Sequence, residues 1–124
     1  MIYAIGIDLA EVARVRQAIE RHGERFLERI FTASERAYCQ RYQSPWERYA
    51  ARFAAKEAGM KALGTGWRGV AWRDFEVSHE PGGRPRLELH GSARARAERL
   101  GIRRFSLSLT HTHEYAMAEV LAET

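Results

Sequence analysis

A carboxylate stands in this chain where the helical pattern otherwise shows only apolar side chains. Four such side chains share one face of a predicted helix, at ~100° per residue: Trp46, Tyr49, Phe53 and Met60. Glu57 follows Phe53 by four residues and precedes Met60 by three, so its carboxylate falls inside this stripe. Because an unpaired buried carboxylate is costly, Glu57 needs compensation. It either pairs with Arg52, Lys56 or an arginine of another element, or it serves as a metal ligand or catalytic base.

A second carboxylate, Asp8, closes a short apolar run at the start of the chain. The run Ile2–Ile7 is rich in β-branched residues and predicts a buried strand. Asp8 either caps the helix that begins two residues later or binds a metal ion. Mg²⁺ commonly takes one or two carboxylates and completes its shell with water and phosphate oxygens. Asp8 and Glu57 are therefore the pair whose proximity matters most.

Basic and glycine-rich segments next to Glu57 would suit a phosphate ligand. Lys56 and Lys61 flank Glu57, and Gly64-Thr65-Gly66 follows, where the backbone can approach a ligand closely. The glycine spacing matches neither the P-loop nor the dinucleotide fingerprint, so a helix stop followed by a turn explains it better than a phosphate-binding loop.

The segment His111-x-His113 raises the question of a zinc site. Two histidines in a turn, with the single cysteine Cys39 far away in the sequence, make a poor ligand set for zinc. We expect these histidines to be solvated, or one of them to meet a phosphate.

The elements that must position these residues are helices in the first half and strands in the second. Capping patterns begin helices at Thr32, with Glu35 in the capping box, at Ser44 and at Ser92. Gly23 and Gly64 end two of them. Helices are predicted over Ala10–His22, Arg25–Ile30, Thr32–Tyr42, Ser44–Leu63 and Ser92–Gly101, and strands over Ile2–Ile7, Val70–Ser78, Arg86–His90, Phe105–Leu109 and Tyr115–Leu121. The class is α+β, with a mostly antiparallel sheet packed against the long helix.

Composition limits the kind of protein. The 124 residues are 45% hydrophobic and 29% charged, which excludes a disordered chain, and no apolar run approaches the ~20 residues of a membrane span. We expect one domain over residues 1–124, in the cytoplasm, because a lone cysteine suits a reducing compartment and no signal peptide is apparent. The net charge of +4, carried mainly by arginine, favours an anionic partner.

Four segments together resemble a known family, the short bacterial-type phosphopantetheinyl transferases that act as holo-acyl-carrier-protein synthases. These segments are MIYAIGIDLAEVARV, RIFTASE, RFAAKEAGMKALGTG and SLSLTHTHEYAMAEV. The resemblance implies transfer of phosphopantetheine from coenzyme A to a serine of apo-acyl carrier protein, a step of fatty acid biosynthesis that releases adenosine 3′,5′-bisphosphate. It also implies Mg²⁺ as cofactor and a homotrimer whose active sites lie between subunits.

The resemblance assigns roles to individual residues. Asp8 and Glu57 are implied as the Mg²⁺ ligands and, with Lys61, as the catalytic group. Lys61 would steady the leaving phosphate, and the general base is Glu57, a metal-bound water, or Glu35 acting through water. The positions implied to contact coenzyme A are Arg52, Lys61, Gly64, Pro85, His111 and Thr112.

A row of arginines predicts where an acidic carrier protein would dock. Arg14 and Arg21 share one helix face, and Arg25 and Arg29 follow one helical turn apart. The alternative, a non-catalytic basic domain that binds nucleic acid, would need aromatic side chains exposed among the arginines, and no such module is evident. We therefore expect neither a nucleic-acid nor a membrane partner.

Overall fold

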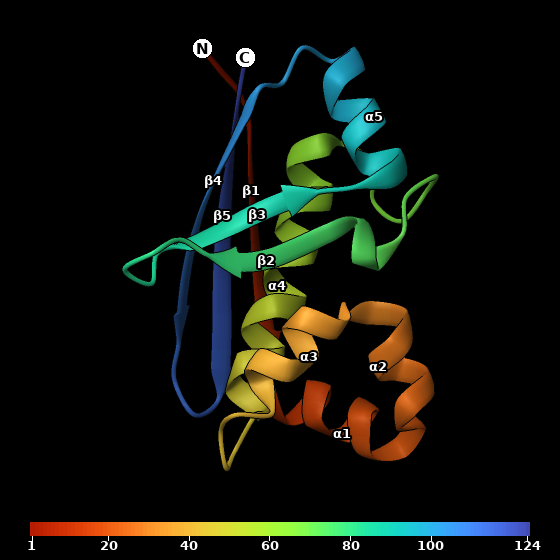
Figure 1. Ribbon diagram of the computed structural model, residues 1–124, viewed down its shortest axis with the longest axis vertical. Helices are drawn as coiled ribbons and strands as arrows, with labels where there is room; N and C mark the ends of the chain where they lie inside the picture. The colour runs from red at the N-terminus through yellow and green to blue at the C-terminus, as the bar shows by residue number, and fades with distance from the viewer.

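The computed structural model describes residues 1–124, and its architecture is α+β with antiparallel strand pairing, as predicted (Figure 1). The elements in chain order are β1 (Ile2–Glu11), α1 (Val12–His22), α2 (Glu24–Ile30), α3 (Ala33–Cys39), α4 (Trp46–Leu63), the 3₁₀ turn η1 (Trp72–Asp74), β2 (Phe75–His79), β3 (Pro85–Leu89), α5 (Gly91–Arg99), β4 (Arg104–His111) and β5 (Tyr115–Glu123). They form one three-stranded sheet in the order β1-β5-β4 and a separate β2-β3 hairpin. None of the helices combines the length and hydropathy that a membrane span requires.

Helix α4 is the centre of the fold and packs between the two sheets (Figure 1). The backbones of α4 and β1 are in direct contact at Gly6, where a Cβ atom would overlap the carbonyl oxygen of Ala58. On the hairpin side, a Cβ atom at Gly59 would come within 2.8 Å of the Phe75 ring. Glycine and alanine along α4 therefore let a buried helix lie close to strands on two sides.

Strand β1 is not the buried strand that its apolar run predicted. Its inward residues Gly6 and Ala10 are buried, whereas Ile5, Ile7 and Leu9 are 57%, 51% and 55% exposed. The reason is the two-residue period of a strand, which turns alternate side chains to opposite faces, and α4 covers only one of them. The other face of the three-stranded sheet is open, and its β1 side is apolar.

The capping predictions have mixed outcomes. The box at Thr32 is confirmed: the Thr32 hydroxyl accepts from the Glu35 N–H at 3.2 Å, and the Glu35 carboxylate accepts from the Thr32 N–H at 2.9 Å. The caps predicted at Ser44 and Ser92 are wrong. Pro45, with φ −81° and ψ −5°, precedes α4 without a side-chain cap, and α5 begins before Ser92, which therefore lies inside its first turn.

Two predicted boundaries also shift. Helix α3 ends at Cys39, three residues before the predicted Tyr42. The strand predicted from Val70 begins only at Phe75, because residues 72–74 form a 3₁₀ turn. The Asp74 carboxylate closes this turn by accepting a hydrogen bond from the Ala71 N–H at 3.1 Å.

Candidate active site

Asp8 and Lys61 meet where β1 crosses α4. Asp8 lies two residues after Gly6 on the same face of β1, so the close strand–helix contact directs its side chain toward the helix. The Lys61 ammonium donates to Asp8 Oδ1 at 3.2 Å and to the Ile7 carbonyl oxygen at 2.9 Å. Asp8 is 11% exposed and Lys61 56% exposed, so the pair sits at the edge of the core and opens to solvent on the lysine side.

Glu57 shares a cavity of about 220 Å³ with Asp8. Burial, and next the charge of Asp8, raise the pKa of Glu57 to about 7, while Lys61 opposes this rise. Two carboxylates thus face one lysine that is half in solvent. Such a site carries more negative charge than its own cation offsets, and oxygen ligands of this kind suit Mg²⁺. The residues present therefore fit a magnesium ion.

Glu57 does not form an ion pair with its neighbour Lys56, because Lys56 pairs with Glu35 instead. The Lys56 ammonium, fully buried, donates to Glu35 Oε1 at 2.7 Å and to the Phe75 carbonyl oxygen at 2.5 Å. Glu35 also accepts from the Val77 N–H at 2.8 Å. Burial lowers the pKa of Lys56, and Glu35 counteracts it. Glu35 is 1% exposed, and its hydrogen bonds join α3 to α4 and β2. It is therefore poorly placed to act as a base through water.

The cavity around Asp8 and Glu57 contains residues that sequence reasoning did not place there. Glu11 and Arg14, at the junction of β1 and α1, and Phe53, one turn before Glu57 on α4, all line it. The sequence predicts only carrier docking for Arg14, because its helical spacing carries no sign that the end of β1 lies beside α4. An arginine therefore stands at the mouth of the candidate metal site.

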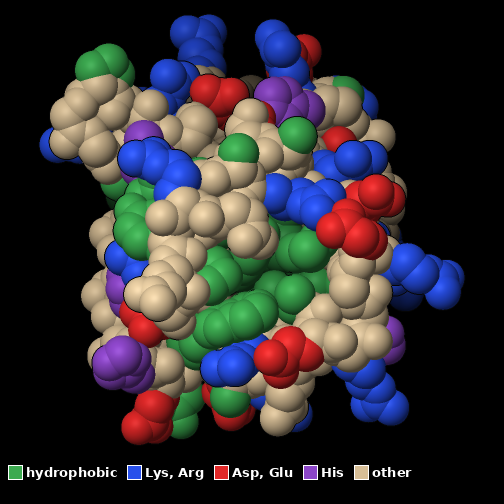
Figure 2. Space-filling view, turned by 60° about the horizontal axis from the view of Figure 1, so that its bottom comes forward, with side chains coloured by type: hydrophobic (Ala, Val, Ile, Leu, Met, Phe, Trp, Pro, Cys, Tyr) green, Lys and Arg blue, Asp and Glu red, His purple; other side chains and the backbone are tan.

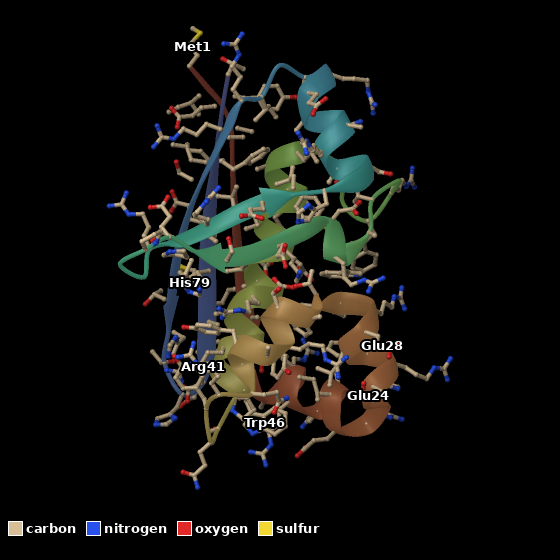
Figure 3. All side chains as sticks on the ribbon, viewed as in Figure 1. Met1, Glu24, Glu28, Arg41, Trp46 and His79 are labelled. Atoms are coloured by element: carbon tan, nitrogen blue, oxygen red, sulfur yellow. The ribbon has the colours of Figure 1, made fainter.

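Arg52 is the second unusual charge, on the other side of α4. It is 3% exposed, and its Nε and Nη2 atoms have no hydrogen-bond partner. Its guanidinium lies 4.2 Å from the ring centroid of Tyr38, and Tyr38 stacks on His79 at 4.6 Å. His79 is paired across the hairpin with Pro85, and Figure 3 shows His79 and Arg41 on the side of α4 away from α2. Burial, and then Arg52, lower the pKa of His79. A buried guanidinium with free N–H groups is suited to an anion.

Neither Tyr38 nor His79 belongs to a recognisable motif, so sequence reasoning missed both. The stacking joins α3 to the end of β2, two segments about 40 residues apart in the chain. No local spacing could have revealed such a contact.

The remaining positions expected to contact coenzyme A lie apart within one chain. Gly64 follows Lys61 by three residues, at the end of α4, and donates its N–H to the Lys61 carbonyl oxygen at 3.1 Å with φ +76°. Arg52 precedes Lys61 by nine residues, which at ~100° per residue puts it on the opposite side of α4. His111 lies 3.2 Å from Glu47 in the first turn of α4, about 20 Å along the helix axis from Lys61.

The β4–β5 turn is held by Thr112 and by Glu47. The Thr112 hydroxyl accepts from the N–H groups of Glu114 and Tyr115 at 3.2 and 3.1 Å. His113, which is 97% exposed, lies 3.0 Å from the same Glu47 carboxylate that His111 contacts. A single chain thus gathers Asp8, Glu57, Lys61 and Gly64, and it leaves Arg52, Pro85, His111 and Thr112 elsewhere.

The predicted arginine row is exposed to solvent on α1 and α2. Arg14, Arg21, Arg25 and Arg29 are all exposed, and only Arg14 has a carboxylate within 4 Å, Glu11 at 3.9 Å. Figure 2 brings this helical end of the molecule forward and shows Lys and Arg side chains around a hydrophobic surface that is hollowed at its centre.

A separate acidic group on the hairpin could also hold a metal ion. Glu76 and Glu88 face each other across β2 and β3, and with His90 they offer ligand atoms within 4.8 Å of one another. The Glu76 carboxylate already accepts from the Thr32 hydroxyl at 2.6 Å and lies 2.9 Å from His90 Nε2. These internal contacts satisfy the group without an ion.

The fold and the Asp8–Glu57–Lys61 group agree with the known proteins that this chain resembles in sequence and structure. Residues 4–119 match the family model of the 4'-phosphopantetheinyl transferase superfamily, and the chain belongs to this superfamily. Within it, the holo-[acyl-carrier-protein] synthase of Solibacter usitatus is 56% identical over 124 residues, 99% of each chain. These findings confirm the family that the sequence motifs indicated.

Solved structures agree as well. The crystal structure of holo-[acyl-carrier-protein] synthase from Neisseria meningitidis superposes with a TM-score of 0.92 at 36% identity and covers 100% of both chains. The Helicobacter pylori synthase, solved in complex with coenzyme A, has a TM-score of 0.85 at 30% identity, covering 96% of this chain and 99% of that one. None of these likenesses supports the alternative of a nucleic-acid-binding domain.

Proposed function

We propose that this chain transfers the 4'-phosphopantetheine group of coenzyme A to a serine of apo-acyl carrier protein and releases adenosine 3′,5′-bisphosphate. The observation that carries the proposal is the Asp8–Glu57–Lys61 group, assembled by β1 and α4 in a member of the phosphopantetheinyl transferase superfamily. Residues 1–124 act as one transferase domain. The enzyme works in the cytoplasm, where the buried thiol of Cys39 stays unpaired.

Asp8 and Glu57 would hold the magnesium ion. When bound, Mg²⁺ supplies positive charge to the phosphoryl oxygens of the donor. The support is the pair of carboxylates in one cavity: burial, and next the charge of Asp8, raise the pKa of Glu57 to about 7. Because a carboxylate must be ionised to ligate, proton and metal compete at Glu57.

Lys61 holds the leaving phosphate. An ammonium has three N–H donors, and two of them are used by Asp8 and the Ile7 carbonyl, so one is free for a phosphate oxygen. The serine oxygen attacks the phosphorus that bears pantetheine, and the bond to the bridging oxygen breaks. The serine proton passes to Glu57 or to water at the site, since Glu35 is buried in its pair with Lys56.

A homotrimer would complete the donor site. The open face of the three-stranded sheet carries Ile5, Ile7, Leu9, Tyr115 and Met117, each at least 38% exposed. Monomers rarely expose apolar patches of this kind, and burying the patch between copies removes it from water. The separation of His111 and Thr112 from Lys61 within one chain supports a site to which a neighbouring copy contributes these residues.

Coenzyme A would contact both the Asp8–Glu57–Lys61 group and the region around Arg52. The Helicobacter pylori relative was solved in complex with coenzyme A. In this chain, the unpartnered Nε and Nη2 atoms of the Arg52 guanidinium offer an anion site near His79, which pairs with Pro85 across the hairpin. The exposed arginines of α1 and α2 would dock the acidic helix of the carrier protein and speed encounter.

Mass spectrometry of apo-acyl carrier protein, incubated with this protein, coenzyme A and Mg²⁺, tests the proposal. We expect the carrier to gain the mass of one phosphopantetheine group, and to gain nothing when Mg²⁺ is replaced by a chelator. If the carrier stays unmodified under all conditions while a cooperative melt shows that this protein is folded, the proposed function is refuted.

A further inference from the structure

A small cavity of about 260 Å³ lies between α5 and the glycine-rich loop that follows α4. Three of its seven lining residues are arginines, and none is acidic. Arg68 comes from the loop, and Arg96 and Arg99 come from α5. Figure 1 shows α5 at the end of the molecule away from α1 and α2, so this cavity is separate from the arginine row on those two helices.

The three arginines have no counter-charge within the chain. None of the ion pairs involves Arg68, Arg96 or Arg99, so each lacks a carboxylate oxygen within 4 Å, whereas Arg16 and Arg94 each pair with a glutamate. Like charges around one small cavity repel one another, because the low-dielectric walls screen them less than water does. The folded chain therefore carries uncompensated positive charge here, which an anion would neutralise.

The acidic groups nearby are already engaged. Glu98, on α5, accepts a hydrogen bond from Arg94 at 3.1 Å. Asp74 lies against the start of α5, where a Cβ atom at Gly91 would come within 2.8 Å of its carboxylate. The same carboxylate accepts from the Ala71 N–H at 3.1 Å, and it does not line the cavity. Neither acid is therefore in place to offset the three arginines.

The donors of the cavity are held in place by α4 and α5. Ser92, Arg96 and Arg99 follow one another at four and three residues, so they share one face of α5. Arg96 is half-buried, and its Nε donates to the Leu63 carbonyl oxygen at 3.3 Å, at the end of α4. A guanidinium has five N–H donors, so four of those of Arg96 are still available for a ligand. An anchored side chain loses less conformational entropy on binding than a free one.

We propose that this cavity is an anion site that binds one phosphate group, either free phosphate or the phosphate of a small molecule, an inference that goes beyond the proposed function. Guanidinium groups bind phosphate oxygens bidentately, and three of them around one cavity match a doubly charged oxyanion. The volume lies below the ~300–1,000 Å³ of most small-molecule sites, which suits a single anionic group. The cavity shares no lining residue with the Asp8–Glu57 cavity, so it is a second site.

A bound phosphate would fix the glycine-rich loop to α5. Without an anion, Arg68 on the loop is repelled by Arg96 and Arg99 on the helix. A phosphate that accepts hydrogen bonds from both sides replaces this repulsion by attraction, and it thereby ties residues 64–71 to α5. The loop begins at Gly64, three residues after Lys61, so the anion would also steady the end of α4.

Phosphate titrations of matched variants test the site. Arg68→Gln and Arg99→Gln each remove one exposed charge of the cavity, and Arg94→Gln removes one from the same helix outside it. Calorimetry with inorganic phosphate, at an ionic strength held constant with chloride, should show binding about tenfold weaker in Arg68→Gln and Arg99→Gln. Arg94→Gln should stay within twofold of the unsubstituted chain. Any phosphate held at Lys61 or Arg52 contributes equally in all four proteins.

Amide hydrogen exchange locates the bound phosphate. Phosphate should slow exchange in residues 64–71 of the unsubstituted chain and of Arg94→Gln. It should leave the exchange of this loop unchanged in Arg99→Gln, whose substitution lies on α5 and not on the loop. Because Arg99 is exposed, this variant should melt like the unsubstituted chain in chloride buffer, which shows that it is folded.

A phosphate monoester distinguishes the two sources of the group. If glycerol 3-phosphate binds within twofold of inorganic phosphate and protects the same loop, the site accepts a phosphorylated small molecule. If only inorganic phosphate binds, the site is restricted to the free ion. Both results support a phosphate site, and neither measurement depends on turnover or on the proposed function.

Three results would overturn the proposal. Equal phosphate affinity in all four proteins, or an equal loss in Arg94→Gln, would show that the cavity does not bind the anion or that only net charge matters. If coenzyme A abolishes the protection of the loop by phosphate and Arg99→Gln raises KM for coenzyme A, the cavity belongs to the donor site. If Arg99→Gln raises KM for the carrier protein and leaves phosphate affinity unchanged, the cavity belongs to carrier docking.

Discussion

Replacing Glu57 by Gln separates a metal ligand from a structural carboxylate. Gln keeps the shape and polarity of the side chain but removes one ligand charge beside Asp8. If both carboxylates hold Mg²⁺, kcat should fall by about 10²–10³-fold, because charge on the phosphoryl oxygens is then poorly offset. The Mg²⁺ concentration needed for half-maximal rate should rise as well.

The same substitution should stabilise the metal-free protein at pH 8. The pKa of Glu57 rises from 4.5 to about 7, and each pKa unit corresponds to ~1.4 kcal/mol, so the folded state bears at most about 3 kcal/mol for the ionised group. Partial contact with solvent reduces this to about 1–2 kcal/mol. Folding favours the protonated form, so the cost is complete above pH 7, shrinks as pH falls and vanishes below pH 4.5.

Thermal melts in chelator at pH 8 and pH 5, with kcat measured against Mg²⁺ on the same samples, check both statements. Glu57→Gln should melt higher than the unsubstituted protein at pH 8, and the gain should shrink at pH 5 or with Mg²⁺ present. Glu98→Gln, at a glutamate that is 67% exposed on α5, is the control and should leave rate and melting unchanged. Normal turnover with an unchanged Mg²⁺ response would refute the metal assignment. A lower melting temperature in chelator at pH 8 would show instead that Glu57 is held in a stabilising ion pair.

Three further outcomes are expected. Gly6→Ala should destabilise the protein by more than about 2 kcal/mol in denaturant melts, because its Cβ would overlap the Ala58 carbonyl; a normal melt would contradict the β1–α4 packing. The Cys39 thiol should resist thiol reagents at pH 8 until the chain unfolds, because burial raises its pKa to about 12, and rapid labelling of the native protein would disprove this. Reversing Arg21 and Arg25 to Glu, which leaves the Asp8–Glu57 cavity untouched, should raise KM for carrier protein and leave KM for coenzyme A nearly unchanged; an intact carrier KM would move the docking site elsewhere.

Local chemistry predicted much of the fold. The capping box at Thr32 forms, and Gly23 and Gly64 end their helices in the φ > 0 region, since these features depend on neighbours within four residues. The cap predicted at Ser44 failed nevertheless. Ser44 offers a side-chain cap, but the backbone at Pro45 enters α4 without using it.

Helical spacing alone shows that Glu57 needs compensation, because it places a carboxylate among apolar side chains. It could not determine the partner. Lys56, its immediate neighbour, turns away to Glu35, 21 residues earlier in the chain, and Asp8 reaches Glu57 only because Gly6 lets β1 lie against α4. The apolar run likewise predicts the first strand, but one face of this strand stays open because α4 packs only against the other. Periodicity and capping are properties of adjacent residues, whereas the pairing of charges and the covering of faces depend on how separate elements pack.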